Sequence, residues 1–98
     1  METIYKGAVY NGFTVESEIR LDTAQCNLFN VACKYRVQLK VVERNVTTGY
    51  AYTLTLGKAA TDNAPTGVYD LELFGADGSM ASYVKNFAKI VPTSKQPD

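Results

Sequence analysis

The sequence predicts an all-β protein, an antiparallel β-sandwich of six or seven short strands. Two observations predict it. Apolar and polar residues alternate with period two along most of the chain, and turn-forming residues recur roughly every ten residues. Helical stripes of apolar residues are scarce by comparison. A small closed β-barrel is the alternative architecture, because the same pattern of short strands can build either one.

Each predicted strand has an apolar register for the core and a polar register for solvent. In one strand Phe13 and Val15 alternate with charged and polar neighbours, and in another Leu71 and Leu73 alternate with acids. The regular strands are expected at residues 13–21, 35–41, 50–56, 69–73 and 80–91, and a less regular leading strand at residues 3–10.

The connections carry their own signals. Residues 23–33 break the alternation, which predicts a short helical turn or a crossover between sheets that tucks Phe29 into the core. Asp77-Gly78 has the chemistry of a tight hairpin turn with Gly78 at positive φ, and residues 62–67 form a polar loop. Residues 92–98 are expected to be extended or frayed, so that residues 1–98 form one domain.

Composition excludes several classes of function. Ten basic residues balance ten acidic ones, which argues against nucleic acid or an anionic membrane as the partner. The chain has no His, the commonest general base near neutral pH and the commonest metal ligand. No signal peptide is evident and no apolar run approaches the roughly 18 residues of a membrane span, so we expect synthesis in a cytoplasm.

The two cysteines, Cys26 and Cys33, do not have the spacing of a zinc site or of a redox motif. We therefore expect no metal and no other cofactor. The two residues are expected to be small, buried apolar side chains. A disulfide between them is the alternative, which synthesis in a cytoplasm disfavours.

Two carboxylate pairs, Glu16/Glu18 and Asp70/Glu72, come closest to a catalytic pattern. Each pair lies at i, i+2 on one face of a strand, and any solvated sheet face has this spacing. A glycosidase-type pair would need a second carboxylate-rich loop facing it, and the sequence offers none. Because no nucleophile–base motif or phosphate-binding loop is recognisable either, we expect no enzymatic activity.

The outward faces of the predicted strands are charged with opposite signs. Lys34, Arg36 and Lys40 line the strand at residues 35–41, whereas the strands at 13–21 and 69–73 are mainly acidic outside. Stripes of opposite sign can pair across neighbouring strands of one molecule. Alternatively, they can meet complementary stripes on another subunit and fix the register of an assembly.

Aromatic residues in the leading segment suggest a contact with another subunit. Tyr5 and Tyr10 either complete the core or anchor a partner, since Tyr is enriched at interfaces. The tail at residues 92–98 is expected to contact a neighbour as well. The candidate interface therefore comprises Tyr5, Tyr10, Lys34, Arg36 and Lys40.

The sequence from residue 67 reads Gly-Val-Tyr-Asp-Leu-Glu-Leu-Phe-Gly-Ala-Asp-Gly and continues into a long final strand that ends near Val91. This segment resembles the last hairpin of immunoglobulin-like modules. It is similar to the small immunoglobulin-like virion proteins of tailed bacteriophages. The resemblance implies an immunoglobulin-like β-sandwich and a role as a capsid decoration or cement protein or as a tail accessory protein.

We therefore expect a non-catalytic virion structural or accessory protein, made in a host cytoplasm. It would act through protein–protein contacts with other subunits of a many-copy capsid or tail. The alternative is a soluble immunoglobulin-like binding module or inhibitor that caps a partner protein. Neither expectation includes nucleic acid, a membrane or a cofactor.

Overall fold

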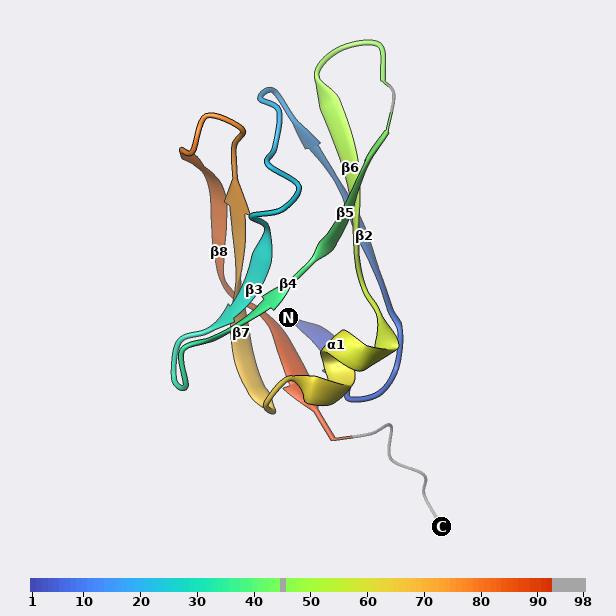
Figure 1. Ribbon diagram of the computed structural model, residues 1–98, viewed down its shortest axis with the longest axis vertical. Helices are drawn as coiled ribbons and strands as arrows, with labels where there is room; N and C mark the ends of the chain where they lie inside the picture. Colours follow the sequence, from blue (N-terminus) through green and yellow to red (C-terminus); the bar gives the residue numbers. More distant parts are fainter. Residues whose placement is uncertain (45, 93–98) are drawn as a thin grey trace.

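The computed structural model describes residues 1–44 and 46–92, which form two facing β-sheets (Figure 1). One sheet has the order β1-β8-β7-β3-β4 and the other the order β2-β6-β5. The elements are β1 (Glu2–Tyr5), β2 (Tyr10–Ser17), β3 (Asn27–Asn30), β4 (Tyr35–Gln38), β5 (Lys40–Arg44), β6 (Tyr50–Leu56), α1 (Lys58–Asn63), β7 (Gly67–Phe74) and β8 (Met80–Val91). Within the described residues the sheets do not close into a barrel, so the sandwich is confirmed and the barrel alternative is wrong.

The strand order is that of an immunoglobulin-like sandwich. In the usual lettering, β2-β6-β5 corresponds to strands B, E and D, and β8-β7-β3 to strands G, F and C. The Tyr69 hydroxyl donates a hydrogen bond to the carbonyl oxygen of Pro65 at 2.6 Å, which is the tyrosine corner of these domains. The sheets are not wholly antiparallel as expected, because β1 pairs in parallel with β8. The chain crosses to the other sheet between β1 and β2 instead of turning back on itself.

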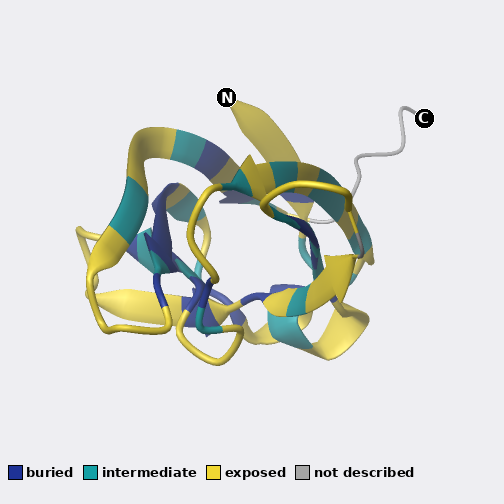
Figure 2. Ribbon diagram, turned by 90° about the horizontal axis from the view of Figure 1, so that it is seen from above, coloured by how far each residue is buried: buried dark blue, intermediate teal, exposed yellow. Residues whose placement is uncertain are grey.

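Period-two patterning places the core where the sequence predicts it. Tyr69, Leu71 and Leu73 of β7 are buried, and buried residues of β6 pack in the same cluster. Viewed from above, exposed residues dominate the loops, whereas most of the buried stretches lie on strands (Figure 2). The hydroxyl of Tyr52 accepts a hydrogen bond from the Leu21 N–H at 2.8 Å, so a polar atom inside the core has its partner.

The connection at residues 23–33 contains a strand, β3, rather than a helical turn or a simple crossover. Leu28 is the residue that enters the core. Phe29 is only half-buried and lies under the guanidinium of Arg36, 4.0 Å from the ring centroid. The expectation for Phe29 was therefore wrong, because the alternation of a strand sends neighbouring side chains to opposite faces.

The chain changes sheets at Leu39, which divides the predicted strand at 35–41 into β4 and β5 (Figure 1). With β3, this raises the count among the described residues to eight, instead of six or seven. The predicted strand at 13–21 is displaced toward the N-terminus, since β2 begins at Tyr10 and ends at Ser17. The Ser17 hydroxyl donates to the Ile19 carbonyl at 2.7 Å and accepts from the Ile19 N–H at 3.1 Å, which turns the chain there.

Short connections close the two ends of the sandwich. Gly78 has φ of +86° and its N–H donates to the Gly75 carbonyl at 2.9 Å, as the Asp77-Gly78 turn predicts. The predicted loop at 62–67 begins inside α1, whose buried Thr61 donates from its hydroxyl to the Ala8 carbonyl at 2.6 Å. No helix within residues 1–44 and 46–92 is long and apolar enough to cross a membrane. Most of the predicted tail, residues 93–98, lies outside the described residues.

Candidate functional site

The two predicted tyrosine anchors differ in environment. Tyr5 lies on the edge strand β1 and is exposed, so it is available to a partner. Tyr10 is half-buried, packs against the core, and donates its hydroxyl to the Glu2 carboxylate at 3.2 Å. Burial, and then the charge of Glu2, raise the pKa of Tyr10 to about 12. Tyr10 therefore serves the fold, and Tyr5 is the better interface candidate.

The three predicted basic residues do not form one stripe. Arg36 lies on β4 in the five-stranded sheet, whereas Lys40 lies on β5 in the three-stranded sheet. Lys34 occupies the β3–β4 turn with φ of +59°. Because the chain changes sheets at Leu39, these charges belong to different surfaces and cannot act as a single basic face.

Asp70 and Glu72 are buried, with 4% of each residue exposed, although they occupy the outward register of β7. Arg36 donates to both carboxylate oxygens of Glu72, at 2.9 and 3.3 Å, and this bond raises the pKa of the arginine. Asp70 accepts from the Tyr83 hydroxyl, which raises the pKa of Tyr83 to about 12. The expected solvated face is therefore wrong for this pair, because β7 lies inside the sheet and its neighbours cover it.

Asp70 also holds a bulge in β8. Tyr69 pairs with Ala88 and Leu71 pairs with Val84, so residues 85–87 lie opposite the single residue Asp70. The Asp70 carboxylate accepts the N–H of Asn86, which has φ of +54°, at 2.9 Å. Within the same bulge Phe87 packs against Phe13 of the other sheet, with ring centroids 4.9 Å apart. Asp70 is thus committed to the fold.

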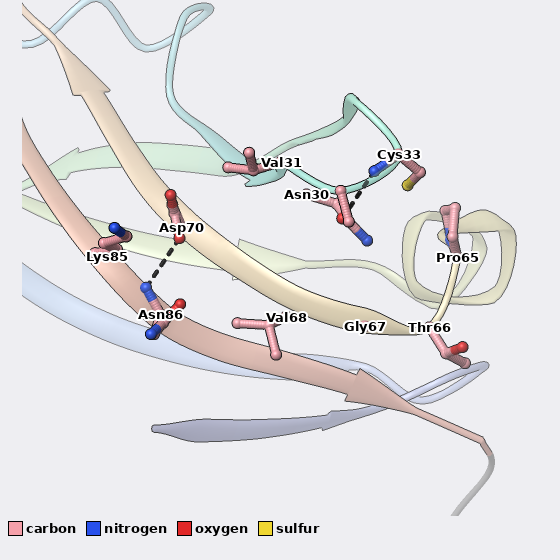
Figure 3. A pocket seen from close by; sticks show the side chains of 11 residues that line it. Asn30, Val31, Cys33, Pro65, Thr66, Gly67, Val68, Asp70, Lys85 and Asn86 are labelled. Carbon is pink, nitrogen blue, oxygen red and sulfur yellow. Dashed lines mark hydrogen bonds between the residues drawn. The ribbon is translucent and has the colours of Figure 1, made fainter.

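A pocket of about 580 Å³ lies over the start of β7, between the β3–β4 turn and the β8 bulge (Figure 3). Val31 and Val68 supply apolar surface, and Cys33 and Lys85 lie at opposite ends of the view. The side-chain oxygen of Asn30 accepts the Cys33 N–H at 3.3 Å, which shapes the turn. Apolar surface beside an amide and an ammonium group can bind a small mixed polar and apolar group.

The cysteines differ from expectation in one respect. Both thiols are free, as expected, instead of forming the alternative disulfide, and Cys26 is buried. Burial raises the pKa of the Cys26 thiol. Cys33 is exposed, so the prediction that both are buried was wrong. The seven-residue spacing spans the strand β3 and part of the turn after it, and spacing alone does not show which cysteine lies outside.

A second opening, which we call the lateral cleft, separates the two sheets on the side of β2 and β8. Its volume is about 550 Å³. The acids Glu16 and Glu18 lie at its rim on the β2 side. Its apolar lining includes Phe13, Val15, Leu71, Leu73, Val84 and Phe87. The cleft is therefore an apolar space between the sheets that opens beside an acidic edge.

Both strands that border the lateral cleft have an unpaired edge among the described residues. β2 is the outer strand of the three-stranded sheet. β1 covers only residues 88–91 of β8 and leaves residues 80–87 without a neighbour on that side. Met80 and Val84 in this uncovered stretch are exposed apolar residues. Unpaired N–H and C=O groups beside apolar surface are the features through which a further strand adds to a sheet.

Sequence reasoning missed the lateral cleft, although one signal for it was present. The last predicted strand, at residues 80–91, is much longer than the leading segment that can cover it. The part of this strand that the leading segment is too short to cover is left with a free edge. Comparisons with protein families, with curated proteins and with solved structures found no match for the chain. The function of the chain must therefore be inferred from its own surfaces.

Proposed function

We propose that the protein is a non-catalytic structural or accessory subunit of a many-copy assembly and acts through protein–protein contacts. The observation that carries the proposal is the lateral cleft with its two unpaired strand edges. A solitary soluble domain gains by covering such edges, since they invite pairing with other chains. An assembly subunit can keep them open for its neighbours.

The hydrogen bonds of the buried acids support a role in protein–protein contacts. The carboxylates of Asp70 and Glu72 accept hydrogen bonds from Asn86, Tyr83 and Arg36. Their hydrogen bonds tie β4, β7 and β8 together and leave the pair committed to the rigidity of the sheet. A rigid sheet with open edges suits a subunit whose contacts must be repeated many times.

The assembly that we propose is the virion of a tailed bacteriophage, with the protein as a capsid decoration or tail component. Support comes from the resemblance of residues 67–91, which form the β7–β8 hairpin, to the last hairpin of such virion proteins. The immunoglobulin-like strand order is compatible with that resemblance. If the proposal is right, the protein resides on the capsid or the tail of the virion.

A soluble binding module that caps a partner is the second candidate. The pocket between the β3–β4 turn and the β8 bulge favours it, because a concave, mainly apolar surface with a few polar groups can receive a group of a partner. A capping module binds its partner in a discrete complex of fixed small size. A structural subunit instead recurs many times in one particle.

Quantitative mass spectrometry of purified particles distinguishes these functions. We expect the chain in gradient-purified virions of its source at a constant, many-copy ratio to the main capsid or tail subunit. The matched control is the same measurement on the soluble fraction of the infected cells. Recovery of the chain only from the soluble fraction, in a discrete complex with one partner, would contradict the virion proposal and favour the capping module.

A further inference from the structure

On its outward face the three-stranded sheet is acidic at one edge and basic at the other. Glu16 and Glu18 are exposed at the β2 edge, and Lys40 and Arg44 are exposed at the β5 edge. The central strand β6 presents no charge between them, since its outward residues are Ala51, Thr53 and Thr55. This polarity runs across the sheet, perpendicular to the strands.

The pairing register places one acid and one base in the same row. Ala51 of β6 pairs with Glu16 on one side and with Arg44 on the other. The strands β2 and β5 are both antiparallel to β6, so they run in the same direction. If a second sheet continued the first in this register, Arg44 of one copy would lie beside Glu16 of the next. Side chains directly opposite one another on neighbouring strands are close enough to form an ion pair.

We propose that the occupant of the β2 edge is the β5 edge of a second copy of this chain, so that copies continue one sheet. The inference rests on the many-copy assembly proposed above and names the contact between its subunits. The geometry selects the unlike edges, because two β2 edges would bring Glu16 and Glu18 against the same acids. Two β5 edges would likewise oppose Lys40 and Arg44, and like charges directly opposite are destabilising.

Apolar surface favours the same docking. Val41 of β5 is half-buried and aligns with Phe13 through Leu54 of β6. In the continued sheet Val41 of the incoming copy would lie beside Phe13, at the mouth of the lateral cleft. Glu43 is the next inward residue on β5, and Arg20 of its own copy holds its carboxylate at 3.2 Å. The incoming strand therefore covers apolar surface and keeps this acid paired.

The contact is heterologous, since each copy uses a different edge on each side. Such a contact generates an open filament, or a ring where the rotation between copies closes. Its ion pair between Arg44 and Glu16 is exposed, so salt weakens the contact as the Debye length falls from about 10 Å at 0.1 M to about 3 Å at 1 M. We expect reversible association of the 10.8 kDa chain that increases with protein concentration and decreases with salt.

Sedimentation velocity on the full chain tests the inference. We expect the average mass to rise above 10.8 kDa with concentration at low salt. Glu16→Lys and Arg44→Glu should each weaken association about tenfold, because each replaces an attractive pair by a repulsive one. The two variants mixed should associate again. In one contact the introduced lysine of the first variant meets the introduced glutamate of the second, and in the other contact the unaltered Glu16 meets the unaltered Arg44.

Lys58→Glu is the matched control for Arg44→Glu, because it makes the same change of net charge in α1, outside both edge strands. This variant should associate as the parent chain does. Circular dichroism of each variant establishes that it is folded, which the exposure of the substituted sites favours.

A monomer at every concentration and salt overturns the inference and leaves the cleft to a strand of another protein. Association that neither charge reversal weakens also overturns it. Failure here is distinct from failure of the proposed function. A monomeric chain that is still a many-copy component of virions would refute the edge contact alone, and a self-associating chain absent from virions would refute the virion role alone.

Discussion

The strand β7 and the segment from the end of β2 to Glu18 carry the same acidic pattern in opposite environments. In β7 the acids Asp70 and Glu72 are buried, and in the β2 region Glu16 and Glu18 are exposed. Both pairs lie two residues apart beside an apolar register. The acids of β7 are bonded to three neighbouring groups, whereas those of the β2 region lie at the rim of the lateral cleft.

The difference follows from the position of each strand in its sheet. β7 has β3 and β8 on its two sides, so Arg36 and Tyr83 can reach over its outward face. β2 has only β6 beside it among the described residues. An outward acid on an interior strand can therefore become part of the fold, while one on an edge strand remains free for a partner.

The largest effect is expected for apolar residues on the two strands. Leu71 is buried in β7, so Leu71→Ala should lower the free energy of unfolding by about 2–5 kcal/mol. Val15 is half-buried on β2, and Val15→Ala should cost about 1 kcal/mol or less. Urea unfolding at neutral pH measures both. Equal costs would mean that β2 is as well covered as β7 and would remove the contrast.

The acids themselves should show the next largest difference. Asp70→Ala removes the acceptor of both the Asn86 N–H and the Tyr83 hydroxyl and should cost about 1–3 kcal/mol, the net contribution of two hydrogen bonds to a carboxylate. Glu16→Ala removes an exposed side chain and should change stability by about 0.5 kcal/mol or less. The same denaturation experiment compares the two. A stability loss as large for Glu16→Ala would show that Glu16 has a partner within its own chain.

Local patterns sufficed for the features that neighbouring residues determine. The alternation of Tyr69, Leu71 and Leu73 identified their buried face, because strand geometry alone fixes which side chains share a face. Gly78 at positive φ followed from the turn chemistry of its own dipeptide. The β-sandwich followed from the number and spacing of such strands.

Features that depend on contacts between distant residues could not be predicted in this way. Nothing near Asp70 in the sequence shows that Tyr83 and Asn86 will bond to it, since the bulge that brings them there is a property of the folded sheet. The change of sheets at Leu39 is equally invisible, because the alternation continues through it. For the same reason Arg36 and Lys40 were placed on one face, although they lie on two sheets.

A smaller effect separates these two basic residues. Arg36 pairs with Glu72 and covers the ring of Phe29, so Arg36→Ala should cost about 1 kcal/mol, a value discounted for the exposure of the guanidinium. Lys40 is exposed, and the described residues give it no ion pair, so Lys40→Ala should be within about 0.5 kcal/mol of neutral. Thermal unfolding of both variants measures this difference in stability. A neutral Arg36→Ala would mean that the sheet, without Arg36, already stabilises Glu72.

The smallest effect is a change in the pKa of Tyr83, whose hydroxyl donates a hydrogen bond to Asp70. The hydrogen bond to Asp70 raises the pKa of Tyr83 from 10.0 to about 12. Because the folded pKa is the higher one, the neutral phenol favours the folded state. That contribution is complete below about pH 10 and is lost as the pH rises through about 12.

Nuclear magnetic resonance of the Tyr83 ring as a function of pH measures this titration directly. Tyr10→Phe is a useful background, since Tyr10 also titrates near pH 12 for a different reason, its burial. In that background Asp70→Asn should move the Tyr83 titration back toward 10.0, because the neutral amide no longer favours a protonated partner. Glu16→Gln, the matched change on the edge strand, should leave it where it was. A Tyr83 that titrates near 10.0 in the parent chain would show that the hydroxyl is released from Asp70 in solution. The acid of the interior strand would then be as open to a partner as the acids of the edge.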